Sequence, residues 1–511
     1  MKYAMFAFAL IAAACSGTPQ AKAPADPTVT RIETGDLKGV QTGEVIAFKG
    51  VPYAAPPVGD LRWRPPQRAV NWQGVRDASQ HGAICMQKMP NPDNGIGQYP
   101  ASEDCLTLGV WTTKLDRNAM QPVMVWIHGG GFVNGSGSAD LYDGAQLAKR
   151  GVVLVSINYR LGRFGSFAHP LLTKEARNGP VANYGMMDMV ASLEWVKRNA
   201  AAFGGDPNNV TIFGESAGGM AVQKLMTMPS ARGLFHKAIV QSGAGRENVQ
   251  FLDKPNARGL PSAESSGEAF ITSLGVTAAS AKDLRAIPAA DIMAKGDPST
   301  FSGGGPIIDG AIISMTVVEA FEAGKEAPVP YMVGYNSAEF PSKPEDVDAS
   351  LTRTLGAKTA DLPALVATYP DKEDMAARIV GDIIFAEPAR YLARLHAANQ
   401  RPTFLYRFDV VSASVRNRLK GTTHAQERQY VFDTLHTSPY STDENDKVQA
   451  QHAVGYWTNF AKTGNPSGVG HPIWPRYGAD MLMEFTNDGP VSKPSPHKER
   501  WDAIAARYAG Q

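Results

Sequence analysis

The sequence predicts an α/β fold in which helices cover both faces of a central, mostly parallel β-sheet. Residues 123–127 and 152–157 are continuous apolar runs, which are typical of strands buried on both faces. Residues 186–202 have helical spacing, with Met186 and Val190 on one apolar side. Apolar runs and helical segments alternate along the chain, and strands that alternate with helices form parallel sheets.

The elements before and after this core are expected to be more irregular. Residues 28–48 predict short antiparallel strands with turns at Gly35 and Gly43. The proline-rich residues 48–59, continued by residues 61–66, predict an ordered surface loop. Further strands are expected at residues 210–213, 237–243, 329–334 and 403–408.

Two irregular, mostly helical stretches interrupt the pattern, at residues 248–305 and 351–400. We interpret them as helical cap insertions, because no Gly/Ser-rich or charged linker separates them from the body. Residues 28–511 are therefore expected to form a single domain.

Composition excludes some classes of function. The 511 residues include 50 basic and 49 acidic side chains, which gives a net charge of +1. We find no basic run with interleaved aromatic residues, so no nucleic-acid partner is expected. A hydrophobic content of 43% suits a globular protein with a large core.

Residues 1–14 predict an export signal. A positive charge precedes an almost unbroken apolar run from Tyr3, which is shorter than the ~20 residues that span a bilayer. The small residues before Cys15 resemble a lipobox, in which the cysteine is lipidated and becomes the first mature residue, although Ala12 stands where leucine is usual. Residues 15–27, rich in Ala and Pro, predict a disordered tether. We expect a periplasmic or membrane-anchored lipoprotein or, alternatively, a secreted protein.

Cys85 and Cys105 are then an even pair in an exported protein, for which a disulfide is the default. The disulfide would close a loop of about twenty residues and contribute roughly 3 kcal/mol in the chain-entropy model. Two buried free thiols are the alternative.

The rest of the chain is organised around residues 213–219, Phe-Gly-Glu-Ser-Ala-Gly-Gly, which follow an apolar run and precede a helix-like run. A Gly-x-Ser-x-Gly turn between strand and helix is typical of a nucleophile elbow, which exposes a strained serine at the end of a sheet. Gly214 and Gly218 would avoid clashes with the neighbouring strand and helix. The pattern predicts Ser216 as a nucleophile; a glycine-rich turn with a chance serine is the alternative.

Acyl transfer through a serine also needs donors for the oxyanion, a base and an orienting acid. His128 and three glycines follow the strand at residues 123–127, and the glycines let the backbone approach a substrate. We predict that the amides of Gly130, Gly131 and Ala217 form an oxyanion hole. A flexible loop is the alternative, whereas a phosphate-binding loop is disfavoured because no Gly-Lys-Ser/Thr follows.

In this topology the acid and then the base follow the serine along the chain. His424 lies in a loop after a predicted strand and is the best candidate for the base, with His436 and His452 as rivals. Glu339 also lies in a loop after a predicted strand and is the candidate acid. Asp309 competes with Glu339, although its Asp-Gly pair is more typical of a turn.

With these residues, the sequence resembles the type-B carboxylesterase family, the cholinesterase-like branch of the α/β-hydrolases. Residues 203–210 running into residues 214–218 are similar to the family's serine signature. Residues 103–106, Glu-Asp-Cys-Leu, are similar to its second signature, with Gly109 where a polar residue is usual. Further similar blocks lie at residues 142–144, 158–162 and 241–243, so the resemblance covers nearly the whole chain after the leader.

The resemblance implies an α/β-hydrolase fold with one catalytic domain at residues 28–511. By position it assigns Ser216 as the nucleophile, Glu339 as the acid and His424 as the base. It assigns the oxyanion hole to Gly130, Gly131 and Ala217, and it pairs Cys85 with Cys105 in a disulfide. Glu215, Ser242 and Glu427 match family positions that support the site without covalent chemistry. Ala425 departs from the family, because glycine usually follows the histidine.

The sequence therefore predicts a serine carboxylesterase that cleaves small-molecule carboxylic esters through an acyl-enzyme, without a metal or organic cofactor. A non-catalytic binding or adhesion module is the alternative, because the family resembled includes such proteins. Among enzymes, a lipase has no specific support. A choline esterase is disfavoured because residues 86–104 contain no tryptophan to bind a quaternary ammonium. Contact with a membrane is expected only through Cys15, and the sequence leaves the ester and the oligomeric state open.

Overall fold

The structure is a computed structural model that describes residues 26–88, 99–246, 248–296 and 305–508. The predicted export signal, Cys15 and all but the last two residues of the predicted tether lie outside the described residues. At the start of the described chain, the carboxylate of Asp26 accepts hydrogen bonds from Thr28 and pairs with Lys38 at 3.0 Å.

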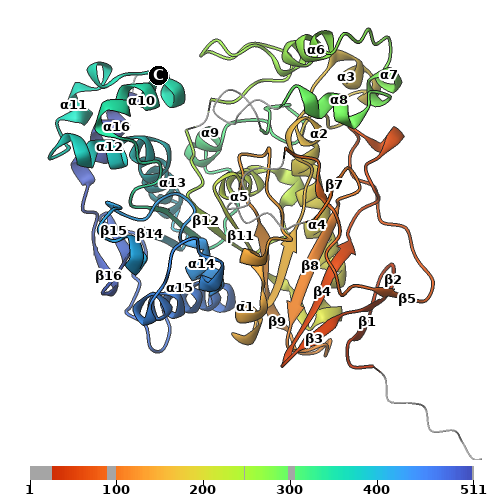
Figure 1. Cartoon of the computed structure of the whole chain (residues 1–511), viewed down its shortest axis with the longest axis horizontal. Coiled ribbons are helices and arrows are strands. Elements are labelled where there is room, and N and C mark those ends of the chain that lie inside the picture. The colour runs from red at the N-terminus through yellow and green to blue at the C-terminus, as the bar shows by residue number, and fades with distance from the viewer. Residues whose placement is uncertain (1–25, 89–98, 247, 297–304, 509–511) are drawn as a thin grey trace, which may run out of the picture.

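Within these residues, an eleven-stranded sheet forms the centre of the molecule (Figure 1). In chain order its strands are β3 (Val40–Thr42), β4 (Val45–Pro52), β8 (Thr107–Thr112), β9 (Gln121–Ile127), β10 (Val153–Ile157), β11 (Gly205–Glu215), β12 (Lys237–Gln241), β13 (Tyr331–Asn336), β14 (Thr403–Asp409), β15 (Met481–Thr486) and β16 (Gly489–Pro494). Their spatial order is β16-β15-β14-β13-β12-β11-β9-β10-β8-β4-β3. Neighbours from β15 to β10 pair in parallel, and the outer pairs are antiparallel, which confirms the mostly parallel sheet.

Side chains of the central strands alternate between two apolar cores, one on each face of the sheet. Val123, Val125 and Ile127 of β9 belong to one core, whereas Met124 and Trp126 belong to the other. Because the side chains of a strand alternate in direction, a continuous apolar run fits only a strand covered on both faces. Each fully buried aliphatic side chain of this kind stabilises the fold by about 1.5–3 kcal/mol.

Helices on the two faces complete these cores. The first core takes in α4 (Tyr184–Asn199), α5 (Ala217–Thr227) and α13 (Glu387–Ala398). The second takes in α1 (Ala145–Lys149), α14 (Arg428–Phe432) and α15 (Glu444–Thr463). No helix within the described ranges is long and apolar enough to cross a membrane.

The predicted insertions are helical, and apart from α13, which packs on the sheet, their helices lie outside the central layers (Figure 1). The green helices at the top of the view are α6 (Ala263–Ser273), α7 (Ala281–Arg285) and α8 (Ala289–Ala294), near α3 (Pro170–Ala176). At the upper left are α10 (Val347–Leu355), α11 (Pro363–Val366), α12 (Lys372–Gly381) and the C-terminal α16 (Lys498–Tyr508). The short helices α2 (Gly162–Gly165) and α9 (Val317–Glu322) join the body to these groups.

Two small sheets flank the main one. One consists of β1 (Val29–Ile32), β2 (Gly35–Lys38) and β5 (Val75–Asp77), and the other of β6 (Ile84–Cys85) and β7 (Ala101–Ser102).

The predicted surface loop at residues 48–59 is wrong over its first part. Strand β4 continues to Pro52, and Val51 pairs with Leu108 of β8 and is fully buried. The pairing register shifts between Phe48 and Val51, and Gly50 in this step has φ of +63°. A glycine bulge therefore lets the strand resume, and Pro52 is tolerated because it lies directly after this bulge.

Candidate active site

The predicted elbow forms a tight turn between β11 and α5. Ser216 lies between the end of the strand at Glu215 and the start of the helix at Ala217, with φ of 56° and ψ of −123°. A non-glycine residue with this backbone conformation is strained by about 1–3 kcal/mol and persists only where its surroundings fix it. Here the Ser216 amide donates to the Gln241 carbonyl at 2.9 Å, and its own carbonyl accepts from the Met220 amide at 2.9 Å.

The two glycines of the elbow are required by sterics. A Cβ on Gly218 would lie 2.0 Å from the carbonyl oxygen of Ile127, and one on Gly214 would lie 2.6 Å from the backbone of Gly218. Strand and helix therefore approach each other more closely than any side chain at these positions would allow.

The structure brings Ser216, His424 and Glu339 together from three loops at the ends of parallel strands. The Nε2 atom of His424 lies 2.9 Å from Ser216 Oγ, and Nδ1 lies 2.7 Å from Glu339 Oε2. With Nδ1–H donating to the carboxylate, Nε2 is left to accept the serine hydroxyl, which is the arrangement that a base needs.

The rival candidates have other partners. His436 is exposed, and Nδ1 of His452 lies 3.0 Å from Nδ1 of His471. Oδ1 of Asp309 accepts three backbone amides between Ala311 and Ile313, as expected of a turn.

Glu339 is held by donors on the oxygen that does not face the histidine. Its Oε1 accepts from the Ser242 hydroxyl at 2.5 Å and from the Asn336 amide at 2.7 Å. Only 1% of the Glu339 side chain is exposed. The carboxylate therefore has one orientation, with Oε2 directed at His424.

Two further buried carboxyls surround the same imidazole. Oε1 of Glu215 lies 3.3 Å from Nε2 of His424. Glu427 accepts from the side-chain amides of Gln241 at 3.0 Å and Asn336 at 2.5 Å. Burial, with the charges of Glu215 and Glu339, raises the pKa of Glu427 to about 7. Burial likewise raises the pKa of Glu215.

These carboxylates determine how readily His424 takes a proton. Burial alone would lower the pKa of His424, but Glu215, Glu339 and Glu427 outweigh burial and raise this pKa above its ordinary value. Nearby negative charge stabilises the imidazolium, so the ring is a stronger base than free histidine.

Two aromatic rings flank the imidazole of His424. The ring centroid of Phe340 lies 4.4 Å away, and that of Phe385, from a π-helical turn at Asp382–Ala386, lies 5.2 Å away in a stacked arrangement. They restrict rotation of the imidazole, while 18% of the His424 side chain stays exposed. Ala425, at the position where the family usually has glycine, has φ of +68°, the left-handed region that glycine prefers.

The glycine loop after β9 passes directly beside the serine. A Cβ on Gly129 would lie 3.1 Å from the Cβ of Ser216. Gly130 and Gly131 follow with φ of +104° and +63°. The loop is anchored at His128, whose ring stacks on Tyr159 at a centroid distance of 4.4 Å. The predicted oxyanion donors are the amides of Gly130 and Gly131 in this loop and the amide of Ala217. Ala217 is the first residue of α5, and the first amides of a helix have no acceptor within the helix.

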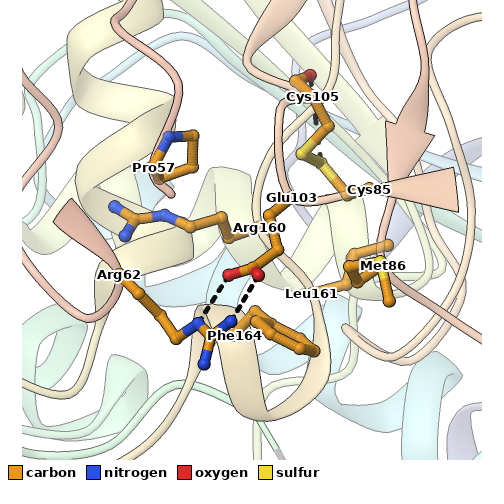
Figure 2. A pocket seen from close by; sticks show the side chains of 9 residues that line it. All are labelled: Pro57, Arg62, Cys85, Met86, Glu103, Cys105, Arg160, Leu161 and Phe164. Atoms are coloured by element: carbon orange, nitrogen blue, oxygen red, sulfur yellow. Dashed lines mark hydrogen bonds and ion pairs between the residues drawn. A yellow bond between two sulfur atoms is a disulfide. The ribbon is translucent and has the colours of Figure 1, made fainter. Parts of the chain in front are cut away.

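Cys85 and Cys105 form the predicted disulfide, with an S–S distance of 2.01 Å. Figure 2 shows it at the edge of a small pocket that also contains Arg62 and Glu103. These two side chains make a two-pronged ion pair with N···O distances of 2.7 and 2.5 Å. Ser216, His424 and Glu339 do not line this pocket, so we regard the pocket as part of the scaffold.

Sequence patterns did not indicate several residues of the site. Gln241, Asn336, Phe340 and Phe385 all contact the histidine or its carboxyl neighbours. The first three are adjacent to, or a few residues from, predicted site residues, which is a usable signal. Phe385 has none, because it reaches the site from an inserted helix. In the part of the chain that the structure describes, no group of three or more His, Cys, Asp or Glu side chains is arranged to hold a metal.

A mostly parallel sheet that presents a serine on a strand–turn–helix elbow, with histidine and a carboxylate from later loops, defines a serine α/β-hydrolase. The model of the carboxylesterase family matches residues 26–355 and 363–500. A fumonisin B1 esterase from Sphingopyxis macrogoltabida is 36% identical over 483 residues, which cover 90% of this chain and 86% of that esterase. A para-nitrobenzyl esterase from Bacillus subtilis (strain 168) is 34% identical over 487 residues, covering 91% and 95%. A solved PNB esterase structure superimposes with a TM-score of 0.80 at 32% identity, covering 94% of this chain and 99% of that one.

The chain therefore belongs to the carboxylesterase family, and it is a carboxylic ester hydrolase.

Proposed function

We propose that this carboxylesterase cleaves small-molecule esters through an acyl-enzyme on Ser216, with His424 as base and Glu339 as the orienting acid. One observation carries the proposal. Hydrogen bonds of 2.7 and 2.9 Å join Glu339, His424 and Ser216 in a continuous line, in a chain of the esterase family.

In the first half-reaction, Ser216 Oγ attacks the ester carbonyl carbon while its proton passes to Nε2 of His424. The imidazolium that forms lies between the carboxylates of Glu339 and Glu215, which stabilise its charge. The tetrahedral intermediate then collapses, the C–O bond to the alcohol breaks, and the alkoxide takes the proton from Nε2. Water then attacks the carbonyl carbon of the acyl-enzyme and gives a proton to His424. The carboxylic acid is released when the bond to Ser216 Oγ breaks and His424 returns the proton to that oxygen.

We assign the oxyanion to the amides of Gly130, Gly131 and Ala217. The closeness of the glycine loop to Ser216 supports this assignment. One such donor contributes about 2.7–4 kcal/mol to stabilisation of the transition state. The mechanism uses these groups and water, and it needs no metal or organic cofactor.

Ser242, Glu215 and Glu427 are proposed as supporting groups. The Ser242 hydroxyl donates to Glu339. Asn336 donates to both carboxylates, from its backbone amide to Glu339 and from its side-chain amide to Glu427. Both contacts fix the acid rather than reach a substrate.

The test replaces Ser216 with alanine and measures hydrolysis of p-nitrophenyl acetate and p-nitrophenyl butyrate. We expect kcat to fall at least about 10³-fold, as when a member of such a triad is removed. Ser414→Ala is the matched control, because among the described residues that exposed hydroxyl bonds only the Ser441 carbonyl. A folded Ser216→Ala variant with wild-type activity would contradict the proposal.

We also propose that residues 28–511 act as one catalytic domain, since a single sheet takes strands from β3 near its start to β16 near its end. Export, with residues 1–14 as the signal and Cys15 as a lipid-attachment site, is proposed on the sequence pattern. The disulfide supports an oxidising compartment. Metabolic labelling with a radioactive fatty acid should mark the wild-type chain and not Cys15→Ser; label on neither protein would favour plain secretion.

A further inference from the structure

The acid and the base lie on two loops that contact each other along their backbones. The loop after β13 carries Glu339, and the loop after β14 carries His424. The Ala338 amide donates to the Thr422 carbonyl at 2.9 Å, and the His424 amide donates to the Glu339 carbonyl at 2.8 Å. The distance between the two loops therefore sets the distance between the carboxylate and the imidazole.

One arginine from outside the sheet spans both loops. Arg378, on the inserted helix α12, donates from Nη1 to the Ser337 carbonyl and from Nη2 to the Lys420 carbonyl, the latter at 2.7 Å. Its Nε donates to Oδ1 of Asp374 at 2.7 Å. Because the guanidinium is planar and rigid, these three contacts fix the two carbonyls relative to each other.

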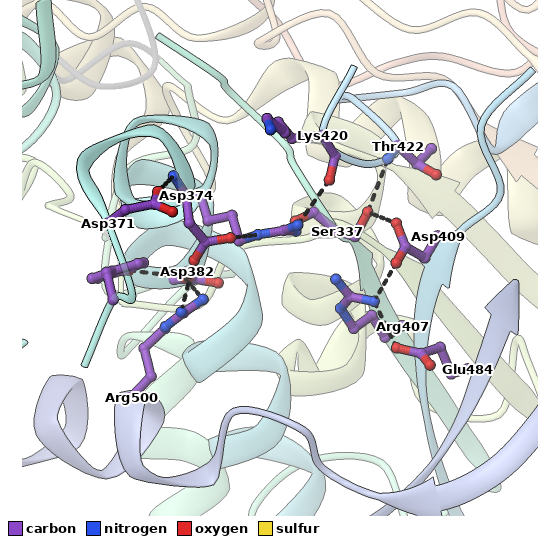
Figure 3. A network of polar contacts seen from close by, with 12 residues as sticks. Ser337, Asp371, Asp374, Asp382, Arg407, Asp409, Lys420, Thr422, Glu484 and Arg500 are labelled. Atoms are coloured by element: carbon purple, nitrogen blue, oxygen red, sulfur yellow. Dashed lines mark hydrogen bonds and ion pairs between the residues drawn. The ribbon is translucent and has the colours of Figure 1, made fainter. Parts of the chain in front are cut away.

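The arginine is itself held in place from the C-terminal helix. Nη2 of Arg500, on α16, lies 3.0 Å from the second oxygen of Asp374, and its Nη1 lies 3.1 Å from Asp382 (Figure 3). Burial would raise the pKa of Asp374, but its hydrogen bond to Arg378 and the charges of Arg378 and Arg500 lower it. Asp374 therefore stays ionised and keeps Arg378 oriented.

On the other side, Ser337 is fixed by a second chain of charges. Its hydroxyl donates to Asp409 of β14 and accepts from the Thr422 amide at 2.8 Å. Asp409 in turn binds Arg407 at 2.7 Å, and Arg407 binds Glu484 of β15 at 2.6 Å (Figure 3). The sheet thus holds the Ser337 side chain, and Arg378 holds its carbonyl.

Helix α12 also packs directly against the acid. A Cβ on Gly381 would lie 2.7 Å from the Cβ of Glu339. Any displacement of α12 would therefore change the position of the Glu339 carboxylate.

We propose that Arg378 is a positioning residue, which sets the spacing of the acid loop and the histidine loop and so keeps Glu339 in hydrogen-bond contact with His424. This inference rests on the proposed roles of Glu339 and His424. It means that an inserted helix, braced by the C-terminal helix, completes the catalytic geometry that the sheet begins.

A merely structural arginine would change stability and leave catalysis alone, so the test needs a matched control. Arg390 on α13 supplies it. Its side chain is 13% exposed, as is that of Arg378, and it pairs with Asp480 and, at 2.8 Å, with Asp502 of α16. Arg378 is linked to α16 less directly, through Asp374, which pairs with Arg500. Asp480 and Asp502, which accept the hydrogen bonds of Arg390, lie outside both loops.

The experiment compares R378M, R378K and R390M with wild type, using thermal melts and pH profiles for p-nitrophenyl butyrate. For R378M we expect kcat to fall about 10- to 100-fold, because a displacement of about 1 Å at a reacting group has this effect, with KM within about 2-fold. The acid limb of kcat/KM should move to lower pH, because a weakened contact with Glu339 raises the pKa of His424 less. R378K should fall between R378M and wild type, and R390M should keep the wild-type kcat and acid limb.

A folded R378M with wild-type kcat and pH profile would overturn the inference, as would the same shift in R390M. If R378M does not fold, R378K decides by the same two readouts. Ser216→Ala is assayed in parallel. Loss of activity in that variant with normal R378M and R378K rejects only the positioning role, whereas retained activity in it rejects the proposed function itself.

Discussion

Replacing Glu215 with glutamine isolates one charge beside His424 and leaves the shape of the site unchanged. The wild-type carboxylate lies 3.3 Å from Nε2 and raises the pKa of the imidazole. At that distance Coulomb's law gives about 1.3 kcal/mol in a water-like medium and about 5 kcal/mol at an effective dielectric constant of about 20. The lower figure is the better guide, because 18% of the His424 side chain is exposed and Arg428 lies 4.0 Å from Glu215 and offsets its charge.

The expected change is therefore a pKa of His424 lower by about 1 unit in Glu215→Gln. Since the neutral imidazole is the active form, the acid limb of kcat/KM should move to lower pH by the same amount. The plateau rate should fall about 10-fold, because the imidazolium loses a stabilising charge. The assay is hydrolysis of p-nitrophenyl butyrate across the pH range, followed at the isosbestic wavelength of p-nitrophenol.

Glu194→Gln is the control, since that side chain is 54% exposed and lies 3.9 Å from Arg198 in a surface ion pair. An acid limb that stays in place in Glu215→Gln, or moves to higher pH, would refute the electrostatic argument.

Three further changes test other parts of the structure. Ser242→Ala removes a hydroxyl that donates a hydrogen bond to Glu339 at 2.5 Å. Since a hydrogen bond to a charged group contributes about 1.5–3 kcal/mol, kcat/KM should fall at least about 10-fold in initial-rate assays. The melting temperature should change by no more than a few degrees. Gly129→Ala places a methyl group 2.7 Å from the carbonyl oxygen of Glu215, 2.8 Å from its Oε2 and 3.1 Å from the Cβ of Ser216. Steady-state kinetics should show a loss of about 100-fold in kcat, and a wild-type rate would mean that the loop does not border the reacting atoms. Replacing both Cys85 and Cys105 with serine should lower the apparent free energy of unfolding in denaturant by about 3 kcal/mol, and an unchanged midpoint would show that the disulfide does not restrict the unfolded chain.

The parallel core of the fold could be predicted from sequence because its signal is local. The apolar run at residues 123–127 lies within β9, and the run at residues 210–213 lies within β11, which begins five residues earlier. Strand β4 is not predictable from the sequence, because proline and glycine usually interrupt strands and only its pairing with β8 shows that a bulge accommodates them. Strand β15 pairs with β16 across a short turn, but it joins the sheet by pairing with β14, where Met483 lies opposite Tyr406 far away in the chain.

The same distinction holds at the candidate site. Ser216 lies in a local pattern, and chain order together with the family resemblance predicts Glu339 and His424 as its partners. The contacts of Phe385 and Arg378 arise from the packing of an insertion, for which composition and periodicity carry no signal.

The central claim, that Ser216 carries the acyl group, is tested most directly by covalent labelling. A fluorophosphonate should add one group per chain, and peptide mapping by mass spectrometry should place it on Ser216. The rate of labelling should fall at least about 100-fold in His424→Ala, because the serine loses its base. Labelling of another residue, or equal labelling of Ser216→Ala, would contradict the account.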